Sequence, residues 1–165
     1  GITSGYIPLG ATLINERVAS AWEAEGPRAV VMHGYTYSGH PVPCAAGLAT
    51  LDLTIREDLA GNAADVGAYL LARLRAVMDR HEVIGDVRGK GLMIAIELVH
   101  DRKTKEPFSP VDPYPGRVSD ACLANGVMLR TIVNKFIISP PLILKREQAD
   151  EIASVLDHAL ATTPR

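Results

Sequence analysis

The sequence lacks a surplus of basic side chains, a long apolar run and a dense set of cysteines. Its 165 residues carry 17 lysines and arginines against 19 aspartates and glutamates, which gives a formal charge of −2. Because neutralising phosphates requires a basic surplus, we expect no nucleic-acid partner. Proline, glycine and charged residues interrupt every apolar run before the ~18–20 residues that a membrane-spanning helix needs, so we expect no membrane span. No signal peptide is recognisable either.

Cysteine and histidine are too sparse to predict a metal site or a disulfide framework. Cys44 and Cys122 lie far apart, without a CxxC spacing or a neighbouring histidine, so reduced thiols in a cytoplasmic protein are expected. His33 and His40 are seven residues apart with no cysteine or paired carboxylate beside them, which is a weak pattern for metal ligands. The hydrophobic content of 47% and the charged content of 22% are typical of a packed globular chain.

Apolar periodicity predicts helices and strands along the chain. Asn15 is a natural N-cap, with Glu16 in the first turn, for a helix that ends near Gly26. Four further helices are expected: one that begins at Pro43, one over 62–80, one that ends at Asn125-Gly126, and one that begins near Lys145. The expected strands are the end of 6–14, then 29–32, 83–87, 92–99, 127–132 and 136–139, with a turn at 88–91 and a surface loop over 101–115.

The distribution of these elements divides the chain near residue 81. Strands cluster after this point with helices between them, which predicts a compact α+β lobe over residues 81–165. Residues 1–80 contain too few predicted strands to close a sheet of their own, so we expect them to belong to a larger domain. The sequence has no internal repeat and no low-complexity segment.

The segment 33–41, HGYTYSGHP, combines the features of an anion-binding loop. Its two glycines expose backbone N–H groups, its threonine, tyrosines and serine carry hydroxyls, and a helix follows. Such a loop at a helix start binds phosphate without lysine or arginine. The same composition also describes an ordinary polar turn before a helix, and both interpretations stay open at this point.

Two arginines lie where their side chains need a partner or a function. Arg88, in the segment RGKG, combines a guanidinium that matches a carboxylate with glycines that let a ligand approach. The same four letters also describe any tight turn. Arg130 lies within the mostly apolar segment VMLRTI, so its side chain points to solvent, to a partner carboxylate or into a site.

Taken together and in order, four segments resemble the C-terminal half of a class III, pyridoxal-phosphate-dependent aminotransferase. They are GITSGYIPLG (1–10), HGYTYSGHP (33–41), VRGKGL (87–92) with Glu97, and ISPPL (138–142). The resemblance implies an α/β protein of fold type I, in which residues 1–80 end the cofactor-binding large domain and residues 81–165 form the C-terminal small domain. It also implies pyridoxal 5'-phosphate (PLP) as the cofactor.

In this family, the lysine that forms a Schiff base with the cofactor immediately precedes the residue that matches Gly1. We therefore expect the catalytic lysine directly before this chain, either lost from a truncated fragment or present in a cofactor-modified form. In the second case, roughly 250–300 further N-terminal residues would complete the large domain. By the same resemblance, Tyr35 and Thr36 hold the cofactor phosphate of the neighbouring subunit, which implies a homodimer or a dimer of dimers.

Carboxylate recognition differs between subgroups of this family. The position of Arg88 binds the substrate carboxylate in ornithine- and aminobutyrate-type relatives. In pyruvate-dependent ω-transaminases, a mobile arginine ten residues before the Pro-Pro pair does so, and here that residue is Arg130. The segment YTYSGH (35–40) is most similar to the pyruvate-dependent type. Many relatives have glycine three residues after the mobile arginine, where this chain has Val133, so a stiffer or differently shaped loop is expected.

The resemblance thus implies an enzyme that transfers an amino group from an amine or ω-amino acid to a keto acid such as pyruvate, through a Schiff base on the lysine. Two other functions stay open, an aminomutase or racemase on the same fold and a non-catalytic fragment that lacks the lysine. An aminomutase or racemase would exchange no keto-acid partner, so a half-reaction assay separates it from a transaminase. Intact mass tests the fragment, because a species of 17.7 kDa cannot hold the full cofactor site.

Overall fold

The computed structural model describes residues 1–24 and 26–165. These residues form two compact units, Gly1–Glu57 and Asp58–Arg165, and each is described by itself. Among the described residues, no helix combines the length and the apolar character that crossing a membrane would require.

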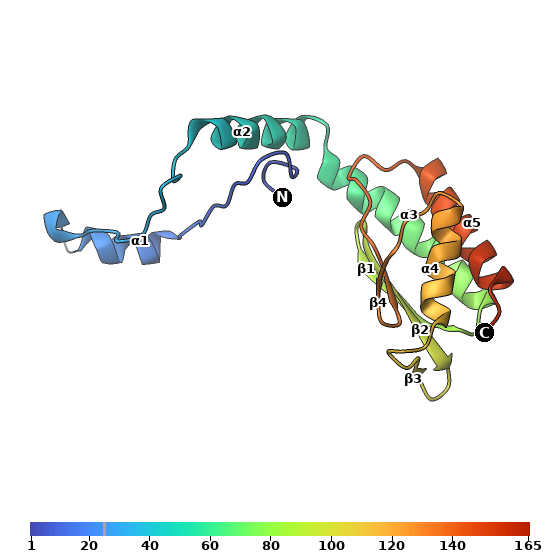
Figure 1. The fold of residues 1–165 in the computed structure, drawn as a ribbon. Coiled ribbons are helices and arrows are strands. Elements are labelled where there is room, and N and C mark those ends of the chain that lie inside the picture. Colours follow the sequence, from blue (N-terminus) through green and yellow to red (C-terminus); the bar gives the residue numbers. More distant parts are fainter. Residues whose placement is uncertain (25) are drawn as a thin grey trace. The chain divides into compact units, whose positions relative to one another are not determined.

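The first unit contains two helices joined by extended segments (Figure 1). α1 (Glu16–Glu23) begins where predicted, because the side chain of Asn15 accepts a hydrogen bond from the N–H of Val18 at 3.1 Å. The helix ends at Glu23, earlier than the predicted end near Gly26. A three-residue 3-10 helix (Gly26–Arg28) follows.

α2 (Pro41–Arg56) begins two residues before its predicted start. The ring nitrogen Nδ1 of His40 accepts a hydrogen bond from the N–H of Val42 at 3.2 Å and so caps the helix. Farther along, Gly47 is buried, and a Cβ at this position would lie 2.9 Å from Cδ2 of Leu9. The N-terminal segment therefore packs closely on α2 where the helix has no side chain.

The two strands predicted in this unit are wrong. Residues 29–32 and the end of 6–14 are irregular, and the described part of the unit contains no strand. A strand needs a neighbour for its N–H and C=O groups, and Val30, Val31 and Met32 are exposed here, without a sheet to enter.

The second unit begins with the longest helix of the described chain. α3 (Leu59–Arg80) starts three residues earlier than predicted, because the Asp58 side chain accepts a hydrogen bond from the N–H of Gly61 at 3.2 Å. α3 contacts β1 (Ile84–Lys90) and α5 (Arg146–Thr162), so it belongs to the same compact unit as the sheet.

The boundary between the compact units precedes α3 and so differs from the predicted boundary near residue 81. The reason is that α3 packs on β1 and α5, which follow it in the sequence. The assignment of residues 1–80 and 81–165 to a large and a small domain of a longer enzyme stays a prediction.

An antiparallel sheet forms the centre of the second unit. Its strands follow the order β1-β2-β5-β4, with β3 pairing on β2. The remaining bounds are β2 (Met93–Asp101), β3 (Glu106–Pro107), β4 (Arg130–Ile132) and β5 (Lys135–Ile138), with α4 (Tyr114–Ala124) between β3 and β4. The predicted loop over 101–115 therefore contains the last residue of β2, the short strand β3 and the first two residues of α4. The predicted strand over 127–132 is shorter, because only its last three residues pair with β5.

The turn predicted over residues 88–91 is wrong. Arg88 pairs with Ala95 inside the β1–β2 ladder, and β1 continues to Lys90. The chain reverses over two residues that begin at Gly91, whose φ of +56° lies in the left-handed region that favours glycine. A Cβ on Gly67 of α3 would lie 2.2 Å from the Gly91 carbonyl, so the helix backbone approaches this turn directly.

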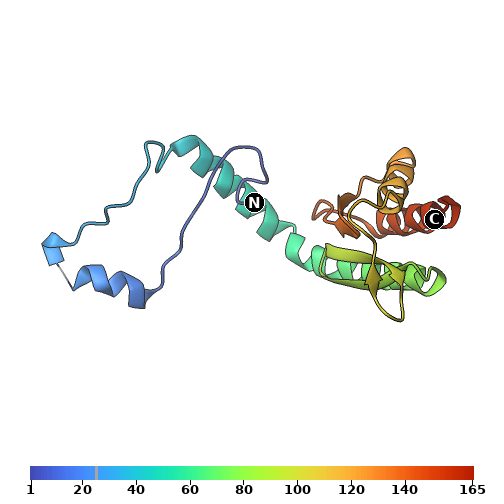
Figure 2. The ribbon, with the colours of Figure 1, turned by 60° about the horizontal axis from the view of Figure 1, so that its bottom comes forward.

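The core lies on one face of the sheet, where alternate residues of β2 and β5 are buried. In both views β1 and β2 lie along α3 (Figures 1 and 2), and α5 contacts both α3 and α4. The largest fully buried side chains are Leu70, Leu74, Val77, Ile84, Ile94, Ile96, Leu98, Val118, Cys122, Phe136 and Leu156. Both cysteines are free thiols, and burial raises the pKa of Cys122 to about 11.

Candidate functional site

The predicted phosphate loop closes on itself by short hydrogen bonds. The N–H of Tyr35 donates to Oγ of Ser38 at 2.9 Å, and the N–H of Ser38 donates to the carbonyl of Tyr35 at 2.9 Å. Gly39 then takes a φ of +72°, which turns the chain into α2. The loop therefore has a defined turn without any contribution from Thr36.

Thr36 lies at the tip of this turn with free donors. Within the described residues, neither its hydroxyl nor the N–H groups of Thr36 and Tyr37 have a hydrogen-bond partner. Beside them lies a pocket of about 870 Å³ between residues 7–12 and the loop, lined by Tyr35 and Tyr37 among others. Exposed N–H and O–H groups next to a helix start can accept an anionic group.

Arg88 and Arg130 lie on one face of the second unit's sheet. Arg88 pairs with Ala95, Ala95 with Ile137, and Ile137 with Arg130, so the four residues form one row across β1, β2, β5 and β4. Directly paired residues project to the same face. With neighbouring strands ~4.8 Å apart, the two arginines begin about 14 Å from each other, near opposite edges of the sheet.

The Arg88 guanidinium is already engaged by two carboxylates. Its Nη1 donates to Asp86 at 2.5 Å and to Glu97 at 3.0 Å, and these hydrogen bonds raise the pKa of Arg88. Glu97 also pairs with Nζ of Lys135 at 3.3 Å. Burial raises the pKa of Glu97, but the hydrogen bonds from Arg88 and Lys135 outweigh it, so the pKa lies below its ordinary value.

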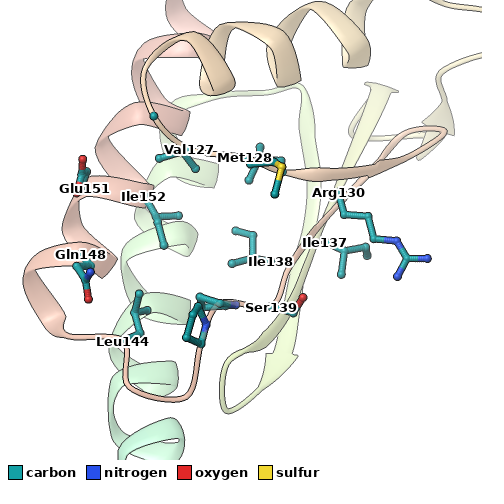
Figure 3. Close-up of a pocket in the computed structure, with 14 residues that line it drawn as sticks. Val127, Met128, Arg130, Ile137, Ile138, Ser139, Leu144, Gln148, Glu151 and Ile152 are labelled. Atoms are coloured by element: carbon teal, nitrogen blue, oxygen red, sulfur yellow. The ribbon is translucent and has the colours of Figure 1, made fainter. Parts of the chain in front are cut away.

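Arg130 has no such partner among the described residues. Arg130 is among the residues that line a pocket of about 680 Å³, together with Met128, Ile138 and Ile152, and in Figure 3 its guanidinium is directed away from these side chains. Arg130 is therefore an exposed cation on the face it shares with Arg88, available to an anion from outside this chain.

Comparison with known proteins identifies the family. A family model for class III aminotransferases matches residues 1–160. The chain belongs to the class III aminotransferases. Among solved structures, it is similar to an amine transaminase from an uncultivated Pseudomonas species in a PLP-bound form, with 53% identity, a TM-score of 0.94, and coverage of 99% of this chain and 37% of that one.

Two further relatives support this membership. An (S)-enantioselective ω-transaminase from Thermomicrobium roseum is 40% identical over 98% of this chain and 35% of its own, with a TM-score of 0.88. An uncharacterized aminotransferase of Sinorhizobium fredii is 41% identical over 97% of this chain and 35% of its own. The chain thus spans about a third of the relatives it matches. These structures also confirm the predicted fold class, α/β of the fold type I transaminases.

In this class III aminotransferase chain, Arg88 and Arg130 share one face of the sheet but lie near its opposite edges, and Tyr35 and Thr36 lie in one loop. Their roles stay predictions. Sequence reasoning did not identify the carboxylates that engage Arg88, although the alternation of β1 places Asp86 on its face. Among the described residues, no group of three His, Cys, Asp or Glu side chains could hold a metal ion.

Proposed function

We propose that the protein containing this chain is a PLP-dependent ω-transaminase, which transfers an amino group from an amine or ω-amino acid to a keto acid such as pyruvate. The observation that carries this proposal is the exposed Arg130, which has no ion-pair partner among the described residues. A free guanidinium there fits the carboxylate of a keto acid. The 53% identity to an amine transaminase supports the same reaction class.

The loop around Thr36 has the donors that the phosphate of PLP needs. The Thr36 hydroxyl and the adjacent N–H groups are free within the described residues, and a dianionic phosphate accepts several such bonds. PLP supplies an electron sink for the bond-breaking at the substrate carbon. We propose that Tyr35 and Thr36 hold the phosphate bound in the neighbouring subunit of a cytoplasmic homodimer.

We propose that the lysine that carries the cofactor lies immediately before Gly1. The five lysines of the sequence all lie from residue 90 onward, away from the segment that resembles the family's lysine region. Borohydride reduction fixes the cofactor on its lysine, and peptide mapping then locates it. A label on any other lysine would contradict this assignment.

Arg130 is proposed as the main carboxylate anchor, with Arg88 as the alternative. Arg88 neutralises Asp86 and Glu97, so recruiting it for a substrate would leave those carboxylates without their cation. Arg130 gives up no ion pair described in this chain when it binds a carboxylate. When an amine without a carboxylate binds, an exposed arginine can also turn back to solvent at little cost.

The decisive experiment compares two variants on one acid and one amine. We expect Arg130→Ala to raise KM for pyruvate strongly, with a loss of about 2–4 kcal/mol in transition-state binding, and barely to change KM for a carboxylate-free aromatic amine. Arg88→Ala should raise KM for pyruvate less than Arg130→Ala does, with a smaller difference between the two substrates. Equal losses on both substrates for Arg130→Ala would mean a structural role. Turnover of a single substrate without a keto-acid partner would instead indicate an aminomutase or racemase.

A further inference from the structure

The segment that carries Arg130 contains an unusual turn. β4 and β5 are joined by only two residues, Val133 and Asn134, because Ile132 pairs directly with Lys135. Val133 has a φ of +55°. This left-handed region is the one where two-residue hairpins favour glycine, and it is least accessible to a β-branched side chain.

Packing does not explain why valine occupies this conformation. The Val133 side chain is half exposed, so its own burial contributes little to hold it there. The constraint comes from the next residue. Asn134 is buried, its carbonyl accepts from the N–H of Leu98 at 2.8 Å, and its side-chain amide donates to the Leu98 carbonyl at 2.8 Å. Asn134 is thus fixed to β2, and Val133 must take the left-handed φ that connects it to β4.

β4 contains a second unfavourable feature beside Arg130. The hydroxyl oxygen of Thr131 is buried without a hydrogen-bond partner among the described residues, which disfavours the observed position of the strand. β4 is also only three residues long, and among the strands that the structure describes it pairs with β5 alone. The observed position of this edge strand is therefore opposed by Val133 and Thr131 and maintained by Asn134.

We propose that Val133 and Asn134 act as positioning residues for Arg130. The strain at Val133 reduces the free-energy difference between the observed hairpin and an opened hairpin in which φ of Val133 is negative. In the opened hairpin β4 and the backbone of Arg130 are displaced. The backbone strain at Val133 and the hydrogen bonds of Asn134 have opposite effects on this equilibrium. Together they set the fraction of time that Arg130 lies on the carboxylate-binding face of the sheet. The part that concerns substrate choice rests on the proposed function of Arg130.

The test is amide hydrogen exchange over residues 127–138 in the intact protein. Val133→Gly removes the strain and keeps the Asn134 bonds, so exchange of the hairpin should slow about tenfold, which corresponds to about 1.4 kcal/mol in the opening equilibrium. Val133→Ala should give an intermediate rate, because alanine is not β-branched. Asn134→Ala should speed exchange in the same segment.

Lys105→Gly is the matched control, since Lys105 also has a left-handed φ, +58°, in an exposed turn between β2 and β3. It should leave exchange over 127–138 unchanged. In turnover assays, Val133→Gly should lower KM for pyruvate about threefold relative to that for an aromatic amine, with kcat unchanged, and Lys105→Gly should not.

Unchanged or faster exchange in both Val133 variants would overturn the proposal, even if Asn134→Ala failed to fold. An effect of Lys105→Gly as large as that of Val133→Gly would do the same. Slower exchange with no change in the ratio of the two KM values would confine the pair to a structural role. If Arg130→Ala shows no loss specific to pyruvate, the proposed function of Arg130 fails instead, whatever the exchange rates.

Discussion

The Thr36 hydroxyl has no partner within the part of the chain that the structure describes, so it contributes to a site only through what it binds. A hydrogen bond from a hydroxyl to a phosphate dianion contributes about 1.5–3 kcal/mol. We therefore expect Thr36→Ala to weaken PLP retention roughly tenfold to a hundredfold, measured by absorbance during dialysis or by titration of the apoenzyme.

Thr36→Ser keeps the hydroxyl and should retain most of the affinity. Because Thr36 is proposed to serve the neighbouring subunit, a mixed dimer of Thr36→Ala with a variant lacking the catalytic lysine should bind one PLP tightly per dimer. Two weakened sites in that mixed dimer would show that the residue serves its own subunit. An unchanged affinity in Thr36→Ala would make the loop an ordinary turn.

The Glu97 carboxylate provides a pH-dependent contribution to stability. Its pKa is below the ordinary value, so its contribution is fully present above an unfolded pKa of about 4.3 and is lost as the pH falls through the folded pKa. At neutral pH, Glu97→Gln should lower the free energy of unfolding by about 1 kcal/mol, since its side chain is 27% exposed and partly screened.

This difference between wild type and Glu97→Gln should shrink as the pH falls below about 4, in urea titrations at a series of pH values. Glu82→Gln is the control, because the Glu82 carboxylate is 79% exposed and only 3.7 Å from Arg102. A difference that is constant with pH would mean that Glu97 contributes by packing rather than by charge.

The sequence predicts where chemistry-bearing residues lie better than what they contact. Arg130 could be selected because the charged side chain of an arginine in an apolar strand needs solvent, a carboxylate or a ligand around it. In the structure this side chain is exposed. The engagement of Arg88 by Glu97 could not be predicted from spacing, because it depends on the β1–β2 register. The left-handed φ of Val133 is likewise imposed by hydrogen bonds of Asn134 to a strand distant in the sequence.

At the scale of elements, the backbone of helix α3 closely approaches the backbone of the β1–β2 turn at Gly67 and Gly91. Gly67→Ala adds a methyl 2.2 Å from the Gly91 carbonyl, so it should destabilise the unit by about 1–3 kcal/mol. Helix propensity alone would predict a gain of about 1 kcal/mol.

Gly116→Ala in α4 is the matched substitution, because a Cβ there meets nothing within 4 Å. It should stabilise by about 0.5 kcal/mol. Thermal melts of the two variants separate packing from propensity. If both substitutions changed stability in the same direction, close contact at Gly67 would be excluded as the cause.

Among the elements, helices were predicted better than strands. The helices could be located from apolar spacing and caps, since both signals are local to the helix, as with Asn15 and α1. The strand predicted over 29–32 failed because a strand depends on a neighbour that the sequence pattern does not reveal. Arg102 illustrates the same limit, because it donates to the carbonyls of Met78, His81 and Ile84 from within a predicted surface loop.

For the whole molecule, buried apolar residues are distributed unevenly between the two compact units. The described hydrophobic core lies within Asp58–Arg165, whereas in the described part of Gly1–Glu57 only Thr3 and Gly47 are buried. Expressed separately, residues 58–165 should unfold cooperatively on heating, and residues 1–57 should show no thermal transition by circular dichroism. A cooperative transition in residues 1–57 alone would contradict this expectation.

The row of paired residues from Arg88 to Arg130 also limits where residues can be inserted into or deleted from this part of the protein. Both hairpins next to it, β1–β2 and β4–β5, turn over two residues, so a single inserted residue would shift a register and move one arginine to the opposite face. The segment 102–113 is free of this restriction, since only β3 pairs within it. Insertions and deletions among descendants of this sequence should therefore accumulate there and be absent from both turns.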